Sequence, residues 1–247
     1  MYRRGRHVCL PLSLVLGSTM SAKKQMKHPV VMFDFDGTLV DTFEYLFLIG
    51  NMMAKEFGFK GIERHQMTTF KDKTIRQALR ELDVPVFQLP GILLKGMREM
   101  SDRIEDVKMI VGWKTVLHQL KEQAVTLGVV STNTRENIQT VLKRQGLEHI
   151  FDFIFVGSGM LGKPRAIKKA IHQHGLNRDC VLYVADEVRD IEASRRVGIA
   201  VVSVTWGYNS AKILQAHEPD YLIDRPHELL QIVQDMKSQW MNECGAK

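Results

Sequence analysis

The chain has 247 residues, of which 45% are hydrophobic and 25% are charged, a composition typical of a soluble globular protein with one large domain or a core and a smaller insert. Its formal net charge is +6, but residues 1–28 carry six Lys and Arg side chains and no Asp or Glu, so the 28 remaining basic residues balance the 28 acidic ones. A neutral body excludes a protein that binds nucleic acid through phosphate contacts.

Residues 1–28 form the first segment. The basic start and the apolar stretch 8–17 resemble a short signal peptide, but Pro11 and Ser13 interrupt that stretch, and it is far too short to span a bilayer. We expect a disordered extension and no membrane partner, with a targeting segment over residues 1–22 as the alternative. Three cysteines without a Cys-x-x-Cys pair predict reduced thiols in a cytoplasmic protein.

Short apolar runs bounded by glycine, proline or polar residues predict buried strands. The expected strands are 30–35, 125–130, 153–156, 181–185, 200–204 and, more weakly, 221–223. The segments after the second strand predict helices over 134–145, 165–174, 190–197 and 226–240. Strands that alternate with helices indicate a parallel sheet covered on both faces.

The interval between the first two strands breaks this alternation. It spans about 90 residues, where a crossover normally needs about 30. Helices are expected there over 43–57, 74–82, 89–104 and 113–122, and the last of these is the crossover helix. The fold class is therefore α/β, a three-layer Rossmann-like core (29–43 and 107–247) with an inserted all-α subdomain (44–106).

Two carboxylates stand at the end of the first predicted strand, in the run Asp34-Phe35-Asp36-Gly37-Thr38. Burying unpaired carboxylates is costly, so the pair is expected to face a partner such as a metal ion. Gly37 permits an unusual backbone turn at this point. An acidic turn that caps a helix would explain one Asp but not the whole run.

Polar residues follow the other strands, and open parallel sheets bind ligands at the carboxyl ends of their strands. Ser131, Thr132 and Asn133 end the second strand, where hydroxyls and a helix N-terminus can hold an anion, although they also suit an ordinary helix cap. Lys163 precedes a predicted helix and offers a point charge, either to a phosphate or to solvent.

Asp186 and Asp190 bracket the turn after the fourth strand. Mg²⁺ takes one or two protein carboxylates together with phosphate and water, so this pair suits a magnesium site; helix capping by Asp186 is the alternative. Because each group of polar residues stands at a strand end, we expect all of them to reach one crevice.

The motifs resemble those of the haloacid dehalogenase (HAD) superfamily of aspartyl phosphatases, in its phosphoglycolate-phosphatase-like branch. Residues 34–42, Asp-Phe-Asp-Gly-Thr-Leu-Val-Asp-Thr, match the first motif of that superfamily without a departure, and Trp206-Gly207-Tyr208 is also similar to that branch. The resemblance covers residues 29–233. It implies a helical cap, Mg²⁺ as the cofactor and a small-molecule phosphate ester as the substrate.

Carried over residue by residue, the resemblance implies that Asp34 is the nucleophile, which forms an aspartyl-phosphate. Asp36 would be the general acid and base. The carboxylates of Asp34 and Asp186 and the backbone carbonyl of Asp36 would bind Mg²⁺, and Asp190 would ligate it directly or through water.

The resemblance also implies phosphate-binding and substrate-binding residues. Ser131 and Lys163 would hold the oxygens of the transferring phosphoryl group as catalytic residues. In a polar loop of the insert, Lys71, Lys73 or Arg76 would meet a carboxylate or second phosphate of the substrate, with Lys73 as the candidate; a solvated helix start is the favoured alternative. Four further residues are expected to bind substrate: Gly37, Thr38, Thr132 and Asn133.

Three functions fit these motifs. Asp36 favours a phosphatase, because dehalogenases of the superfamily lack an acid/base Asp at that spacing. A sugar-phosphate mutase of the beta-phosphoglucomutase type uses the same motifs, and a catalytically silent regulatory protein on the same fold is a third alternative. The sequence leaves open which ester is used and whether the protein is a monomer or a homodimer.

Overall fold

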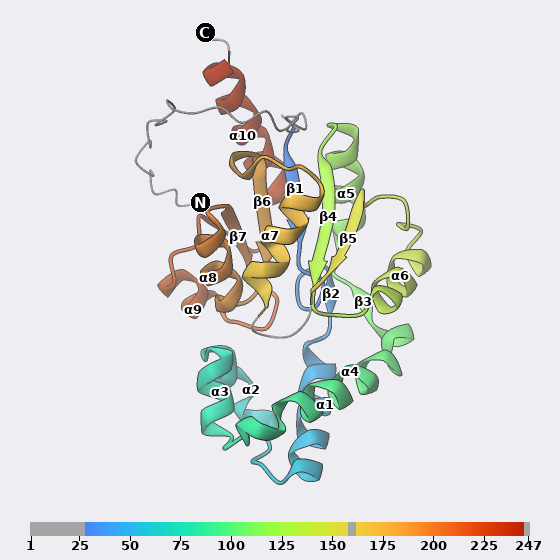
Figure 1. The fold of residues 1–247 in the computed structure, drawn as a ribbon, viewed down its shortest axis with the longest axis vertical. Helices are drawn as coiled ribbons and strands as arrows, with labels where there is room; N and C mark the ends of the chain where they lie inside the picture. Colours follow the sequence, from blue (N-terminus) through green and yellow to red (C-terminus); the bar gives the residue numbers. More distant parts are fainter. Residues whose placement is uncertain (1–27, 158–161, 245–247) are drawn as a thin grey trace, which may run out of the picture.

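The computed structural model describes residues 28–157 and 162–244, so the expectations for residues 1–28, His28 apart, lie outside the described residues. Six strands form one parallel sheet in the order β5-β4-β1-β6-β7-β8 (Figure 1). The strands are β1 (Val30–Phe33), β4 (Thr126–Ser131), β5 (Phe153–Val156), β6 (Val181–Ala185), β7 (Ala200–Val204) and β8 (Tyr221–Ile223).

Helices cover both faces of the sheet, and the side chains of β1 show why. Successive side chains of a strand point to opposite faces of the sheet. All four side chains of β1 are fully buried, so both faces are covered at this strand. Val31 and Phe33 pack into one apolar cluster, while Val30 and Met32 pack into another on the other face. The helices are α5 (Trp113–Glu122), α6 (Arg135–Arg144) and α10 (Glu228–Cys244) beside the first cluster, and α7 (Lys163–Gln173), α8 (Val188–Val197) and α9 (Ala211–Ala216) on the other face.

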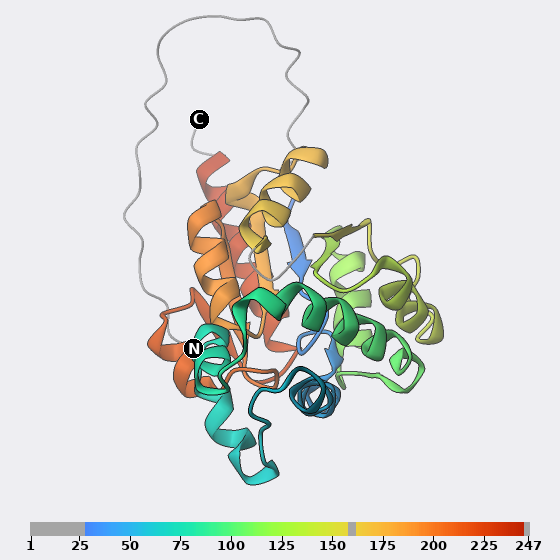
Figure 2. The same cartoon turned by 60° about the horizontal axis from the view of Figure 1, so that its bottom comes forward.

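A separate helical lobe, residues 43–106, faces the carboxyl ends of the strands (Figure 1). The chain enters and leaves it through an antiparallel pair, β2 (Val40–Asp41) and β3 (Lys108–Met109). Figure 2 shows the lobe in front, with α4 lying across it and α1 seen end-on. Its helices are α1 (Phe43–Phe57), α2 (Met67–Lys71), α3 (Ile75–Glu81) and α4 (Leu89–Ser101), with short 3₁₀ turns at Arg64–Gln66, Val86–Gln88 and Ile104–Asp106.

The sheet and its flanking helices confirm the predicted α/β class. The first strand is shorter than expected, because the chain turns after Asp34, and the amides of Leu39 and Val40 both donate to the carbonyl of Phe35. The pair β2–β3 and the helices α2 and α9 were not predicted, since two to six residues are too few to display a period. No helix of the described residues has the length and apolarity needed to cross a membrane.

Candidate active site

The turn after β1 brings Gly37, in the run 34–38, into contact with Asp186, which follows β6. Gly37 has φ +71°, in the left-handed region, and a Cβ at this position would lie 2.3 Å from Oδ2 of Asp186. The carbonyl of Thr38 accepts hydrogen bonds from the indoles of Trp113 at 2.8 Å and Trp206 at 3.1 Å. The glycine therefore supplies both the backbone conformation and the space that the approach of Asp186 requires.

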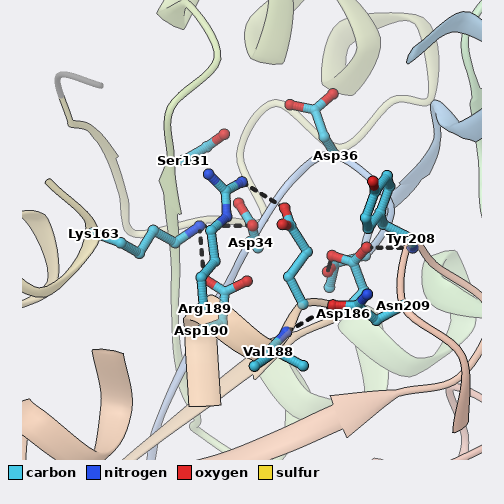
Figure 3. Close-up of polar contacts among 12 residues, drawn as sticks. Asp34, Asp36, Ser131, Lys163, Asp186, Val188, Arg189, Asp190, Tyr208 and Asn209 are labelled. Carbon is cyan, nitrogen blue, oxygen red and sulfur yellow. Dashed lines mark hydrogen bonds and ion pairs between the residues drawn. The ribbon is translucent and has the colours of Figure 1, made fainter. Parts of the chain in front are cut away.

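Three carboxylates gather beneath this turn: Asp34, Asp186 and Asp190 each offer an oxygen within 4.8 Å of the others. Lys163, at the start of α7, reaches the same cluster, where its Nζ lies 2.6 Å from Asp34 and 3.2 Å from Asp190. All four side chains are buried, and Figure 3 shows them converging from the ends of neighbouring elements. The single ammonium of Lys163 pairs with two of these three buried carboxylates, so the cluster suits a further cation.

The cluster fits a hard metal ion such as Mg²⁺. Both carboxylate oxygens of Asp190 are buried and receive no hydrogen bond from the described residues. Burial and the neighbouring carboxylates raise the pKa of Asp186 well above its usual range. Neighbouring carboxylates that repel one another are stabilised by a divalent cation, which removes the repulsion and favours their ionised form.

Asp186 is held in place on both sides. The hydroxyl of Thr38 donates to its Oδ1 at 2.9 Å, and the amide of Tyr208 donates to its Oδ2 at 2.7 Å. A Cβ on Gly207 would lie 2.2 Å from the Cβ of Asp186, so glycine is needed on this side too. The structure thus directs the Thr38 hydroxyl toward Asp186, and a contact between Thr38 and substrate stays a prediction.

Asp36 lies apart from the metal cluster. In Figure 3 its carboxylate points away from Asp34 and Asp186. The amide of Asn133 donates to both its oxygens, at 3.1 Å and 3.0 Å. Burial, and then the charge of Asp34, raise the pKa of Asp36 to about 6, against the opposing effect of Asn133. A carboxyl group near this pKa can both donate and accept a proton close to neutral pH.

Asn133 owes its position to the turn after β4. Its backbone amide donates to the hydroxyl of Ser131 at 3.0 Å, and its side-chain oxygen accepts from Asn137 at 2.8 Å. Ser131 is buried, at the end of β4. The run Ser131-Thr132-Asn133 therefore orients Asp36, a role that the sequence did not reveal.

A cavity of about 350 Å³ separates the helical lobe from this site. Every lobe residue on its wall is apolar or glycine, including Phe43, Phe47 and Phe70. The core contributes the polar side chains of the wall, which are Asp36, Thr132, Asn133, Asp186, Glu187, Arg189 and Tyr208. The cavity is thus polar at the site and apolar toward the lobe.

The lobe is attached to the core by the loop after α2. The amide of Asn209 donates to the carbonyls of Lys71 at 3.1 Å and Lys73 at 2.9 Å, and its side-chain oxygen accepts from the amide of Val188 at 2.9 Å. The Nζ of Lys71 donates to the carbonyl of Gly207 at 2.8 Å. Asn209 therefore joins the lobe to the segment that carries the metal-site carboxylates.

The structure places Lys73 away from this cavity. Its ammonium pairs with Glu81 of α3 and lies over the ring of Phe70, and Lys73 is not part of the cavity wall. Binding of substrate by Lys73 stays a prediction, and its Glu81 partner weighs against it. The sequence analysis gave no role to Arg189, Glu187 or Asn209, although the first two stand between Asp186 and Asp190 in the sequence.

Comparisons with known proteins agree with this geometry. A family model described as "Haloacid dehalogenase-like hydrolase" matches residues 31–204. The chain is 35% identical over 209 residues to the phosphoglycolate phosphatase of Synechococcus elongatus, covering 85% of this chain and 99% of that protein. It is 24% identical over 217 residues to pyrophosphatase PpaX of Bacillus cereus, with shares of 85% and 99%. The solved structure of a haloacid dehalogenase-like family hydrolase from Streptococcus pneumoniae has a TM-score of 0.69 at 22% identity, covering 83% of this chain and 98% of that one.

Proposed function

Because this chain belongs to the haloacid dehalogenase-like hydrolase family, we propose that it is a magnesium-dependent phosphatase that hydrolyses a small phosphate monoester through an aspartyl-phosphate on Asp34. One observation carries the proposal. Asp34 lies against Lys163 in a carboxylate cluster that fits Mg²⁺, while Asp36, two residues further, has a raised pKa and faces the cavity. A nucleophile and a proton donor thus occupy separate positions in the site.

The chemistry proceeds in two steps. An Asp34 oxygen attacks phosphorus and the bond to the ester oxygen breaks, with the leaving alkoxide taking its proton from Asp36. A water molecule then gives a proton to Asp36 and attacks the aspartyl-phosphate, which releases inorganic phosphate and restores Asp34. Lys163 and Ser131 stabilise the phosphoryl oxygens during both steps.

Mg²⁺ held by Asp34, Asp186, Asp190 and the Asp36 carbonyl would supply the positive charge that allows an anionic nucleophile to approach an anionic phosphate. We propose that the helical lobe is the cap of this enzyme and that its closure over the cavity excludes water from the first step.

The leaving group is proposed to be small, as in phosphoglycolate, the ester that gives the Synechococcus elongatus relative its name. The lobe wall carries no polar side chain, so it offers a sugar no side-chain partners for its hydroxyl groups. This weighs against the mutase alternative. The Asn133 contact, which tunes Asp36 for proton transfer, weighs against a silent regulatory protein.

The test is release of inorganic phosphate from phosphoglycolate, pyrophosphate, hexose phosphates and nucleoside monophosphates, with and without Mg²⁺. We expect Mg²⁺-dependent release from phosphoglycolate and a loss of about 10⁴-fold or more in kcat for Asp34→Asn, since the nucleophile is removed. Asp179→Asn changes an exposed carboxylate far from the site and is the matched control. Interconversion of hexose phosphates without phosphate release, or an active Asp34→Asn protein, would contradict the proposal.

A further inference from the structure

Arg189 is the only cationic side chain among the described residues that line the cavity. It stands in the first turn of α8, next to Asp190 in the sequence, and its Nη2 pairs with Oε1 of Glu187 at 2.5 Å. Its Nε is buried and has no hydrogen-bond partner within residues 28–157 and 162–244. Figure 3 shows the guanidinium raised from α8 toward the side of the site where Asp34 and Ser131 lie.

The surroundings of Arg189 are strongly acidic. The polar end of the cavity also exposes Asp36, Asp186 and Glu187 on its wall. The charges of Asp34 and Asp190 also act on the guanidinium. Without Arg189, this end of the cavity would repel any anionic group of a substrate other than the one that meets the metal.

The other nearby cations are already used. Lys163 is buried between Asp34 and Asp190 and does not line the cavity. Lys71 donates to the carbonyl of Gly207, and Lys73 pairs with Glu81. Among the described residues of the cavity wall, Arg189 alone presents a cation to the cavity that Asp36 also lines, where a leaving group would receive its proton.

We propose that Arg189 selects esters whose leaving group carries a carboxylate close to the bridging oxygen, that is, phosphorylated 2-hydroxy acids, by binding that carboxylate directly. This inference rests on the proposed phosphatase function. A planar guanidinium has several donors and can bind a carboxylate through two of them, which an ammonium cannot do with the same geometry. Glu187 holds the guanidinium before substrate arrives and competes with the substrate carboxylate for it.

A purely electrostatic role gives a different expectation. If Arg189 only offsets the acidic cluster or grips the phosphoryl group, its removal lowers activity on every phosphate ester by a similar factor. If Arg189 binds the leaving-group carboxylate, its removal lowers activity only on esters that carry one. Comparing two esters of matched size therefore separates the two roles.

The experiment measures kcat and KM of the full chain with Mg²⁺ on phosphoglycolate and on 2-hydroxyethyl phosphate, which replaces the carboxylate by an uncharged CH₂OH group. For Arg189→Gln we expect kcat/KM to fall about 100-fold on phosphoglycolate and less than about threefold on 2-hydroxyethyl phosphate, because one charge-assisted contact is lost. Arg196→Gln, an exposed arginine on the same helix, is the control. Equal losses on both esters would overturn the inference and leave the proposed function intact.

Two further variants keep the test decisive if Arg189→Gln does not fold. Arg189→Lys keeps the charge but loses the planar fork, and we expect a loss of about tenfold on phosphoglycolate alone. Glu187→Gln removes the competitor, and we expect a lower KM for phosphoglycolate relative to 2-hydroxyethyl phosphate. An unchanged ratio of the two esters in both variants would overturn the inference. No phosphate release from any ester by the unmodified protein would overturn the proposed function as well.

Discussion

The carboxyl edge of the sheet and the helical lobe bury opposite kinds of side chain. Among the described residues, every polar or charged side chain that is buried lies outside residues 43–106, and these include Asp34, Lys163 and Asp190. Seven of the nine large apolar side chains that remain exposed lie inside the lobe, with Phe87 82% exposed. The sheet edge therefore carries the costly buried charges, whereas the lobe buries apolar side chains and keeps its charged ones at the surface.

This difference separates the buried charges of the site from the apolar lobe that faces it. Buried charges are stable only where rigid elements hold partners for them, and the six-stranded sheet provides such a frame. The lobe meets the core through apolar packing and through the hydrogen bonds of Asn209, and none of the buried charges lies in it. We therefore expect substitutions at the sheet edge to affect chemistry strongly, and those in the lobe to affect packing or closure.

Lys163→Met should have the largest effect. It removes the cation that pairs with Asp34 and Asp190, so kcat/KM is expected to fall about 10³-fold, and the free energy of unfolding without Mg²⁺ to fall by about 3 kcal/mol. Phosphate-release kinetics and urea denaturation measure the two effects. Lys143→Met, on an exposed face of α6, is the control, and a Lys163→Met protein with full activity would contradict the division described above.

Asn209→Ala should have an intermediate effect, because Asn209 connects the two regions. The change removes donors to the carbonyls of Lys71 and Lys73 and an acceptor for Val188, and we expect kcat/KM to fall about tenfold. Hydrogen exchange should speed up at the amide of Ser210, which donates to Lys71. Asn177→Ala removes the cap of a short helix away from the site and serves as the comparison.

Met53→Ala should separate stability from chemistry. Met53 is 2% exposed and lines the cavity on the lobe side. The loss of its side chain should cost about 2 to 4 kcal/mol of unfolding free energy, while kcat stays within about threefold because no reacting group is touched. Denaturant unfolding alongside saturating kinetics measures both. A loss of kcat as large as that of Lys163→Met would remove the distinction between the regions.

Lys73→Gln should have the smallest effect. The structure pairs Lys73 with Glu81 within the lobe, so kcat and KM on phosphoglycolate should stay within about twofold of the unmodified protein. A large rise in KM would restore the sequence-based expectation that Lys73 binds the substrate. Comparing Lys73→Gln with Arg189→Gln shows whether the lobe or the sheet edge supplies the cation that binds the substrate.

The sheet was predictable because its strands are short apolar runs bounded by glycine, proline or polar residues, and Asp34 and Asp186 of the carboxylate cluster follow two of those runs directly. Arg189 and Asn209 were not predictable, because their meaning depends on neighbours far away in the sequence. Arg189 is one of many arginines until the cavity shows that no other cation shares its wall. Asn209 gains its role from carbonyls 138 and 136 positions earlier. In the lobe, apolar periodicity indicates helices but not the hollow they enclose.

The two indoles that donate to the Thr38 carbonyl give the protein a built-in optical probe. Trp113 and Trp206 are two of only three tryptophans in the chain, and both lie against the turn that follows Asp34. With Trp240→Phe, the remaining fluorescence would come from this turn alone. Emission recorded during a stopped-flow mixing experiment would then follow the turn in real time, without a label, as metal and ester enter the site.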